Sequence, residues 1–253
     1  MAGYESDDEE LTLSSTTLAA LQEFYVERQS REEEFATLKA RVEALSAAAS
    51  AEGQKLSMEA FGEDWNKSQF WYSEETARFL ANKLLEGATE DMTIAVVSAP
   101  SVFVAMRNML NEAPPEQPRP KLILLEHDNR FAIFPEFVYY DYAQPLKLPG
   151  TCDRFVVDPP FLNHDCQTKT ALTVGWLARP PTTTTTTTEK QTQQRRLILC
   201  TGERMRTLVL RLYKSFGLRT TDYEPAHARG LSNEFYCYAN FDGGWGWRQE
   251  DGE

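Results

Sequence analysis

Three acidic residues of this chain each follow a short apolar segment, where they could bind a polar ligand. Glu126 and Asp158 come directly after segments rich in Leu, Ile and Val, and Asp141 follows the aromatic segment Phe137–Tyr140. In open α/β sheets, ligands bind beyond the carboxyl ends of the strands. Carboxylates accept hydrogen bonds, so three of them at that edge suit ribose hydroxyls and an adenine amino group. The pattern predicts a site for a ligand that contains a nucleoside.

The sharpest local motif is Asp158-Pro-Pro-Phe161, directly after a buried apolar segment. Each proline fixes its own φ angle and lacks an N–H group, so this turn is stiff. The Asp158 carboxylate and the Pro159 carbonyl can hold an amine, while Phe161 packs a flat face against it. This favours methyl transfer to nitrogen, because the lone pair must point at the donor carbon. The alternative is an ordinary Asp-Pro turn.

The turn after the first apolar strand is Ser98-Ala-Pro100, and it lacks the glycines that admit a phosphate. A dinucleotide site requires G-x-G-x-x-G, and a P-loop requires G-x-x-x-x-G-K-[ST]. Their absence argues against NAD, FAD and P-loop nucleotides. A cofactor with adenosine but no phosphate fits better, and that cofactor is S-adenosylmethionine.

The elements that must position these residues alternate between strand and helix. Helices are predicted over 73–87, from 102 to the prolines at 114–115, and over 205–216. Strands are predicted at 93–98, 121–126, 137–140, 154–157, 197–200, 218–223 and 234–241. Short apolar strands between helices predict an α/β fold with a mostly parallel sheet.

The chain has 253 residues, enough for one large domain with an extension. Residues 1–13 are predicted to form a disordered acidic tail, and 14–60 an N-terminal helical extension with apolar residues at helical steps. The main domain is predicted at 61–247, with a solvated Thr-rich insertion at 180–195. We expect the extension to pack on its own protein, with a short coiled-coil contact as the alternative.

The net charge indicates which partners are disfavoured, and the cysteine content indicates the compartment. With 26 Lys and Arg against 38 Asp and Glu, the formal net charge is −12, which disfavours phosphate backbones and anionic lipid. No apolar run approaches the roughly 20 residues that span a bilayer. The four widely spaced cysteines indicate reduced thiols in a cytosolic or nuclear compartment. We expect a cytoplasmic protein, most simply a monomer, without a metal site.

Several ordered motifs together resemble one known family. The matching stretches are Leu18–Tyr25, Ser68–Ser73, Val97–Val102, Glu126–Asp128, Arg130–Ala132, Tyr140–Tyr142, Asp158–Phe161, Cys200–Gly202, Asn233–Phe235 and Cys237–Tyr238. The chain is similar to the eukaryotic elongation factor 1A lysine methyltransferase 1 family, formerly labelled N6-adenine-specific DNA methyltransferase. That family belongs to the seven-strand class I methyltransferases.

The resemblance implies a Rossmann-like sheet and transfer of methyl groups from S-adenosylmethionine to a lysine of translation elongation factor 1A. It assigns to the cofactor the three strand-end carboxylates, the first turn and an aromatic segment that would cover it. These residues are Gln69, Phe70, Trp71, Tyr72, Ser98, Ala99, Pro100, Glu126, Asp128, Asp141 and Asp158. It assigns the target amine to Asp158, Pro159 and Phe161.

Two other functions remain open at this point. An adenine-N6 methyltransferase acting on DNA or RNA would use the same Asp158–Phe161 motif on a base taken out of its stack. Such an enzyme needs a basic channel for the strand, whereas an acidic protein suits a basic protein substrate. A non-catalytic binding module that keeps the fold is the third possibility. For Trp71, the alternative to a cofactor contact is a plug that docks one helix.

Overall fold

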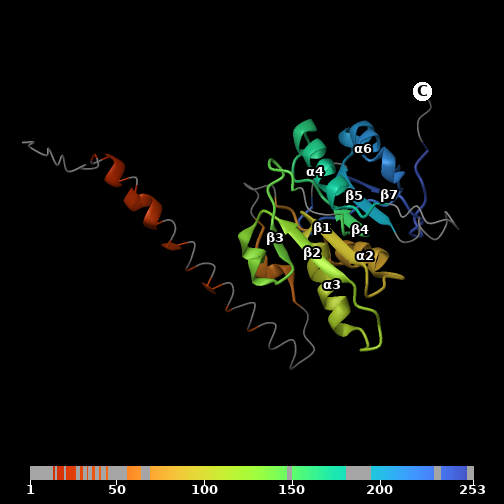
Figure 1. Ribbon diagram of the computed structural model, residues 1–253, viewed down its shortest axis with the longest axis horizontal. Helices are drawn as coiled ribbons and strands as arrows, with labels where there is room; N and C mark the ends of the chain where they lie inside the picture. Colours follow the sequence, from red (N-terminus) through yellow and green to blue (C-terminus); the bar gives the residue numbers. More distant parts are fainter. Residues whose placement is uncertain are drawn as a thin grey trace, which may run out of the picture.

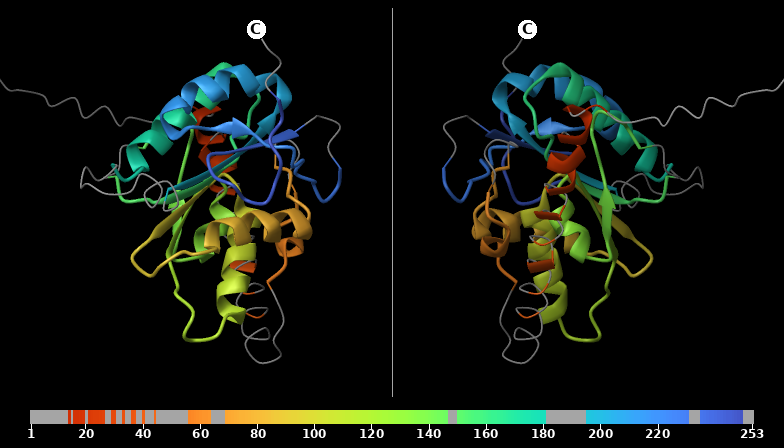
Figure 2. Two further views of the ribbon diagram at one scale, coloured as in Figure 1. Left: turned by 90° about the vertical axis from the view of Figure 1, so that its right-hand side faces the viewer. Right: turned by 90° about the vertical axis from the view of Figure 1, so that its left-hand side faces the viewer.

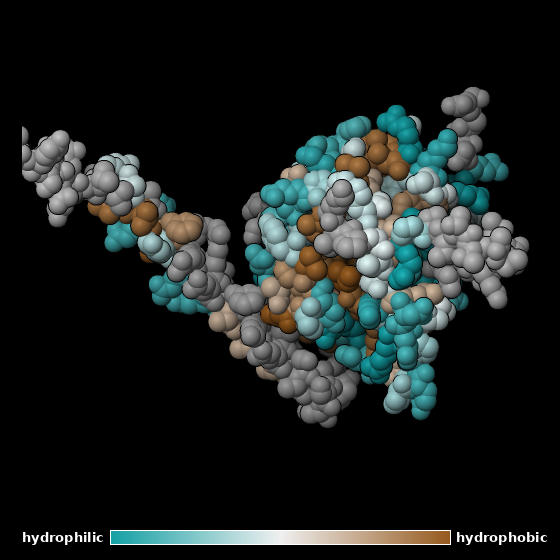
Figure 3. Space-filling view, viewed as in Figure 1, coloured by the Kyte–Doolittle hydropathy of each residue, from teal (hydrophilic) through white to brown (hydrophobic). Residues whose placement is uncertain are grey.

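The computed structural model describes residues 56–63, 69–146, 150–180, 195–230 and 235–249, together with Ser14 and scattered positions from 16 to 44 (Figure 1). The scattered positions are helical, and the side chains described there are exposed. Leu18, Leu21 and Phe24 are among them, and Figure 3 shows apolar surface on this part of the chain. The predicted acidic tail and nearly all of the Thr-rich insertion lie outside the described residues.

A seven-stranded sheet in the order β3-β2-β1-β4-β5-β7-β6 forms the centre of the protein. Its strands are β1 (Thr93–Val97), β2 (Lys121–Glu126), β3 (Phe137–Tyr139), β4 (Arg154–Val157), β5 (Arg196–Gly202), β6 (Arg219–Thr220) and β7 (Phe235–Ala239). The first five strands pair in parallel, and β7 lies antiparallel between β5 and β6. The sheet confirms the predicted α/β architecture. The strand order reverses between β1 and β4, where such sheets bind ligands.

Helices cover both faces of this sheet. Helices α2 (Glu74–Leu85) and α3 (Pro100–Glu112) lie on one face, and α4 (His164–Leu177) and α6 (Arg206–Leu212) lie on the other (Figure 2). The short 3-10 helices are η1 (Met58–Phe61), η3 (Asn129–Ile133), η4 (Glu203–Met205) and η5 (Lys214–Phe216).

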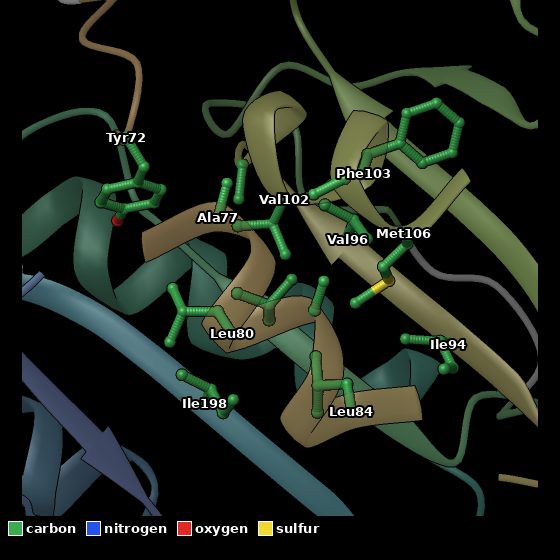
Figure 4. Packing of buried hydrophobic residues seen from close by; sticks show 14 of the residues in the cluster. Tyr72, Ala77, Leu80, Leu84, Ile94, Val96, Val102, Phe103, Met106 and Ile198 are labelled. Atoms are coloured by element: carbon green, nitrogen blue, oxygen red, sulfur yellow. The ribbon is translucent and has the colours of Figure 1, made fainter. Parts of the chain in front are cut away.

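The core follows from the alternation of side chains along each strand. Ile94 and Val96 of β1 face α2 and α3, as Figure 4 shows for the side that carries Leu80 and Met106. The intervening residues of β1 face α4 and α6 instead. Every residue of β1 is buried. A strand covered on both faces must be apolar throughout, which explains its continuous apolar sequence.

Both ends of α2 are anchored, and this places its start at the carboxyl edge of the sheet. The Ser73 hydroxyl caps the helix by accepting the Thr76 N–H at 3.2 Å. At the other end, the Arg154 guanidinium, at the start of β4, donates to the carbonyls of Leu84, Glu86 and Gly87. The start of β4 belongs to the amino edge of the sheet. Helix α2 therefore begins at the opposite edge, next to Tyr72.

Three sequence-based predictions need correction. The helix α4 was not predicted, because its inward face includes polar residues and so lacks an apolar period; these are Cys166, Gln167, Thr170 and Thr173. The strand predicted at 218–223 is only two residues long; Thr221 still donates its N–H to the Cys237 carbonyl of β7 at 2.9 Å, but its bridge is to Trp247. The helix predicted over 205–216 is split into η4, α6 and η5, and Gly217 ends it at a φ of 72°.

Among the described residues, no helix is both long enough and apolar enough to cross a membrane. Cys152, Cys166, Cys200 and Cys237 are all buried and free.

Candidate active site

The carboxyl ends of four neighbouring strands bring four side chains into one row. Val97 of β1 is in register with Leu125 of β2 and Val157 of β4, and β5 continues the ladder beyond β4. The next residues along these strands form the row Glu126, Ser98, Asp158 and Cys200. Ser98 also donates its N–H to the carbonyl of Leu125 at 2.9 Å, so the register extends past the end of β1.

Ser98 has a φ of 54°, the only positive φ of a non-glycine residue in the described part of the chain. That left-handed conformation costs on the order of 1 kcal/mol for a residue with a Cβ. It turns the chain sharply from β1 into α3, which begins at Pro100. Backbone strain at a strand end that faces the switch point of the sheet is typical of a binding site. Ser98, Ala99 and Pro100 therefore lie where the sequence placed them.

Glu126 is a buried carboxylate at the end of β2. Its Oε1 accepts the backbone N–H groups of His127 at 2.8 Å and Asp128 at 3.0 Å. Burial raises the pKa of Glu126 to about 7, although these two bonds favour the charged form. No hydrogen bond from a described residue reaches its Oε2. This oxygen can therefore accept a ligand hydroxyl, as a ribose would require.

Asp128 and Gln69 form a network within the protein. The Asp128 Oδ2 accepts Gln69 Nε2 at 2.8 Å and Arg130 Nε at 2.7 Å, and Arg130 Nη2 donates to Gln69 Oε1 at 2.7 Å. Burial opposes ionisation, but the bonds from Arg130 and Gln69 hold the pKa of Asp128 below its usual value. The network ties the segment before α2 to the end of β2. Its geometry favours a positioning role for both residues.

Trp71 is buried against the residues that surround the segment before α2. Its ring is buried edge-on to Phe131, and its Nε1–H donates to the Phe61 carbonyl at 3.2 Å. Its backbone N–H donates to Glu63 Oε1 at 3.0 Å. The preceding Phe70 is half-buried. These contacts favour the docking alternative for Trp71 over direct contact with a cofactor.

Tyr72 lies beside Asp158. Asp158 is half-buried, and burial together with the charge of Glu126 raises its pKa to about 7, while the neighbouring Tyr72 hydroxyl lowers it. Burial and the Asp158 charge raise the pKa of Tyr72 well above its usual value, so its hydroxyl stays protonated. The Tyr72 oxygen is fully buried and has no hydrogen-bond partner among the described residues. A proton donor therefore stands next to the predicted amine-binding carboxylate.

The turn from Asp158 to Phe161 is held from behind by α4. The buried Gln167 Nε2 donates to the Phe161 carbonyl at 3.1 Å and to Thr201 Oγ1 at 3.0 Å. Asn163 caps α4 by accepting the Cys166 N–H at 2.9 Å. Sequence reasoning missed Gln167, because it found no helix there. The Asn163 cap was the signal that could have revealed this helix.

The outer side of this turn is aromatic. The Phe161 ring is 38% exposed and meets Tyr142 edge-on, with ring centroids 5.5 Å apart. Pro159 is buried. Asp141 is half-buried, and its Oδ1 accepts the Ala143 N–H at 2.8 Å. Asp141 lies past the end of β3 and precedes Tyr142, whose ring contacts Phe161 of the turn 158–161, which we call the acceptor turn.

Comparisons with known proteins show the family to which the chain belongs. Residues 63–243 match the family model described as "Probable N6-adenine methyltransferase". The chain is 44% identical over 240 residues to "Protein-lysine N-methyltransferase EFM5" of Saccharomyces cerevisiae, covering 91% of this chain and 92% of that protein. It is 37% identical to "EEF1A lysine methyltransferase 1" of Gallus gallus, covering 95% and 98%, and 35% identical to the protein of the same name from Homo sapiens, covering 94% and 95%.

The sheet order is that of a class I, S-adenosylmethionine-dependent methyltransferase, and the family model and the relatives are methyltransferases. Within that class, the chain belongs to the N6-adenine methyltransferase family whose curated relatives include EFM5 and EEF1A lysine methyltransferase 1. The resemblance drawn from the motifs is confirmed, as are the fold class, the enzymatic class and the cofactor. The cofactor also fits the residues present, because Glu126 leaves one oxygen open and Ser98 holds the adjacent turn in a strained conformation.

Proposed function

We propose that this protein transfers methyl groups from S-adenosylmethionine to a lysine side chain of translation elongation factor 1A. The supporting observation is the row of Glu126 and Asp158 at one sheet edge, with Tyr72 beside Asp158. The names of the relatives from yeast, chicken and human support a protein lysine as the acceptor. We take residues 61–247 as the methyltransferase unit.

When bound, S-adenosylmethionine supplies an electrophilic methyl carbon on a positively charged sulfur. Glu126 would hold the ribose through its open oxygen, and Asp141 would accept from the adenine amino group. Ser98, Ala99 and Pro100 would border the methionine part. Of the aromatic segment, Tyr72 has the position to meet ligands, whereas Gln69 and Trp71 keep the segment in place.

Asp158 and Pro159 would hold the target amine. A free lysine has a pKa of about 10.4 and is protonated at neutral pH, so it must lose a proton before it can react. Partial burial beside aromatic rings lowers the pKa of an amine, and water can accept the proton. The Asp158 carboxylate and the Pro159 carbonyl then accept the two remaining N–H groups. The lone pair is thereby directed away from them and toward the donor.

The second candidate is methylation of adenine N6 in DNA or RNA, which the description of the family model favours. An adenine amino group also brings two N–H groups, so Asp158 and Pro159 suit it equally well. The net charge of −12 opposes this candidate, because a nucleic acid requires a positive contact surface. The protein substrate is therefore preferred.

The test is a methylation assay with labelled S-adenosylmethionine and three acceptors offered separately: elongation factor 1A, RNA and single-stranded DNA. We expect label in the protein, on a lysine located by mass spectrometry. Asp158→Ala should abolish the transfer while the affinity for the donor, measured by calorimetry, stays largely intact. Label in nucleic acid alone would overturn the proposal in favour of the second candidate.

We further propose a cytoplasmic location. The four free, buried thiols suit a reducing compartment, and the proposed substrate takes part in translation. Fractionation of cells that express the tagged protein tests this, and recovery in a secretory fraction would contradict it.

A further inference from the structure

We propose that the Tyr72 hydroxyl is a positioning group for the reaction: it donates a hydrogen bond to Asp158 and keeps that carboxylate ionised and turned toward the target amine. This inference rests on the proposed function, in which Asp158 binds the amine. It assigns to Tyr72 a role distinct from covering the cofactor.

The backbone of Tyr72 is fixed on both sides. Tyr72 forms an antiparallel bridge with His227 and donates its N–H to Ser101 Oγ at 3.4 Å. Its ring packs against the His227 ring, with centroids 5.0 Å apart. Ser73 follows at once as the cap of α2. The ring therefore has one stable orientation, as a positioning group requires.

The hydroxyl and Asp158 lie on the same side of the sheet. Val156 of β4 belongs to the cluster that faces α2, and Asp158 is two residues further, so it points to the same face. Cys200 and Tyr72 belong to that same cluster, and Figure 4 shows Tyr72 at the start of α2. Tyr72 and Asp158 also shift the pKa of each other, as two side chains on the same face of the sheet can.

The Tyr72 hydroxyl lacks a partner among the described residues, although its oxygen is fully buried. Tyr213 and Tyr238 also have buried hydroxyls without a partner among these residues, so the lack of a partner alone does not indicate a function. Two acceptors neighbour the Tyr72 hydroxyl, the Asp158 carboxylate and the Cys200 thiol, and the carboxylate is the stronger of the two. A small rotation of the Asp158 carboxylate toward Tyr72 would satisfy the hydroxyl. The second carboxylate oxygen would then remain for the amine.

The other groups around Asp158 do not favour its ionised form. Glu126 from β2 raises the pKa of Asp158 through like charge. Cys200 from β5 and Cys166 from α4 interact with Asp158, and burial contributes to raising the pKa of both thiols, so they are neutral. Among the described residues, Tyr72 is the group that lowers the pKa of Asp158. Its loss should therefore leave more of Asp158 protonated at neutral pH.

The experiment compares Tyr72→Phe, which removes one oxygen atom, with the wild-type protein. Losing a hydrogen bond to a charged group should raise the pKa of Asp158 by about one to two units. The acid limb of kcat/KM should move up by the same amount, so the ratio of variant to wild-type activity is low near pH 6.5 and recovers by pH 9. Carbon-13 NMR of the carboxylates, with the Asp158 signal identified from Asp158→Asn, measures the same shift without turnover.

Tyr213→Phe is the matched control, because Tyr213 is also buried with an unpartnered hydroxyl but packs on the α4 and α6 face. We expect it to leave the pH profile unchanged. If Tyr72→Phe lowered activity equally at all pH values, or left the Asp158 titration unchanged, the inference would be overturned. A wild-type protein that methylates no protein substrate would instead overturn the proposed function, while the NMR titration would still test the contact.

Discussion

The two edges of the central sheet differ in how far their polar groups are hydrogen-bonded within the protein. At the amino edge, the Arg154 guanidinium and the Asp153 carboxylate are hydrogen-bonded within the protein, although the buried Nε atoms of Arg195 and Arg196 have no hydrogen-bond partner among the described residues. At the carboxyl edge, a strained serine, two carboxylates and a buried hydroxyl stand together with part of their bonding capacity open. The same strands thus end in a stabilising region on one side and in a binding region on the other.

At the amino edge, charged side chains form hydrogen bonds to backbone groups and to each other. The Arg154 guanidinium, almost fully buried, donates to three carbonyls of the α2 terminus. Asp153 accepts the Thr93 N–H at 2.9 Å and Arg179 Nε at 2.7 Å. The Arg196 Nη1 donates to the Lys83 carbonyl at 2.5 Å. Positive groups at the end of α2 also suit the negative end of its dipole.

The carboxyl edge keeps Glu126 and Asp158 at pKa values of about 7, well above those of free carboxyl groups. In the folded protein these groups are therefore less stable in their ionised forms than they are in water. The carboxyl edge therefore suits a ligand, and its buried carboxylates lower the stability of the folded protein. Such a loss of stability is common at functional sites.

The largest expected effect is on stability, from Arg154→Met. The variant keeps the length of the side chain but leaves three helix-terminal carbonyls without their donor, which should cost about 3–5 kcal/mol of unfolding free energy. Chemical denaturation measures this, and the folded fraction should keep its transfer activity. Arg179→Met, which removes a surface ion pair, should cost no more than about 1 kcal/mol. If both variants lost the same unfolding free energy, the hydrogen bonds of Arg154 would not stabilise the amino edge as stated.

Asp158→Asn should act in the opposite sense. Transfer should fall by about 100- to 1000-fold, because a preorganised charge is lost. The folded protein should nevertheless gain up to about 4 kcal/mol at pH 8, since the native carboxylate has a pKa of about 7 against about 3.9 when unfolded. This gain should shrink as the pH falls from 7 toward 4, where the native Asp158 becomes protonated. A variant that is less stable than wild type at pH 8 would contradict this reading.

Glu126→Gln should weaken donor binding by about 10- to 100-fold, because a hydrogen bond from ribose to a charged acceptor is replaced by a neutral one. The amide oxygen can still accept the N–H groups of His127 and Asp128, so the local fold should persist. Calorimetry with S-adenosylmethionine measures the loss. Glu136→Gln, away from the row, serves as the control, and equal donor affinities in all three proteins would place the donor elsewhere.

Gly202→Ala should have the smallest effect. A Cβ at this position would lie 2.8 Å from Leu162 Cδ1, just behind the acceptor turn. Because Leu162 can shift, we expect about 1 kcal/mol of destabilisation and a correspondingly small loss of transfer. Gly175→Ala, on α4 with open space around it, should stabilise by about 0.5–1 kcal/mol. Thermal unfolding and transfer kinetics of both variants measure how much less tolerant the acceptor turn is than helix α4.

Much of the fold could be read from local patterns. The strands at 93–98, 121–126 and 154–157 were predicted almost to the residue, because a strand buried on both faces is continuously apolar. The Ser73 cap and the stop at Gly87 were equally clear. Helix α4 was not predicted from the sequence, since its buried face carries Gln167 and threonines. These polar residues do not produce a hydrophobic period.

The residues of the candidate site also differ in how far local patterns revealed them. Glu126 and Asp158 were singled out because each directly follows an apolar strand. The family resemblance grouped Gln69, Asp128 and Trp71 with the cofactor, and the structure adds that their polar atoms bond to other residues of the protein. Local chemistry cannot tell which partner a polar side chain will meet.

Local patterns were enough to identify the residues that end the strands, because strand patterns and turn residues act over a few neighbouring positions. The row of Glu126, Ser98 and Asp158, with Tyr72 beside Asp158, follows from the folded structure. Register and helix packing join segments that are far apart along the chain. Their contacts depend on the whole folded core and on no local pattern.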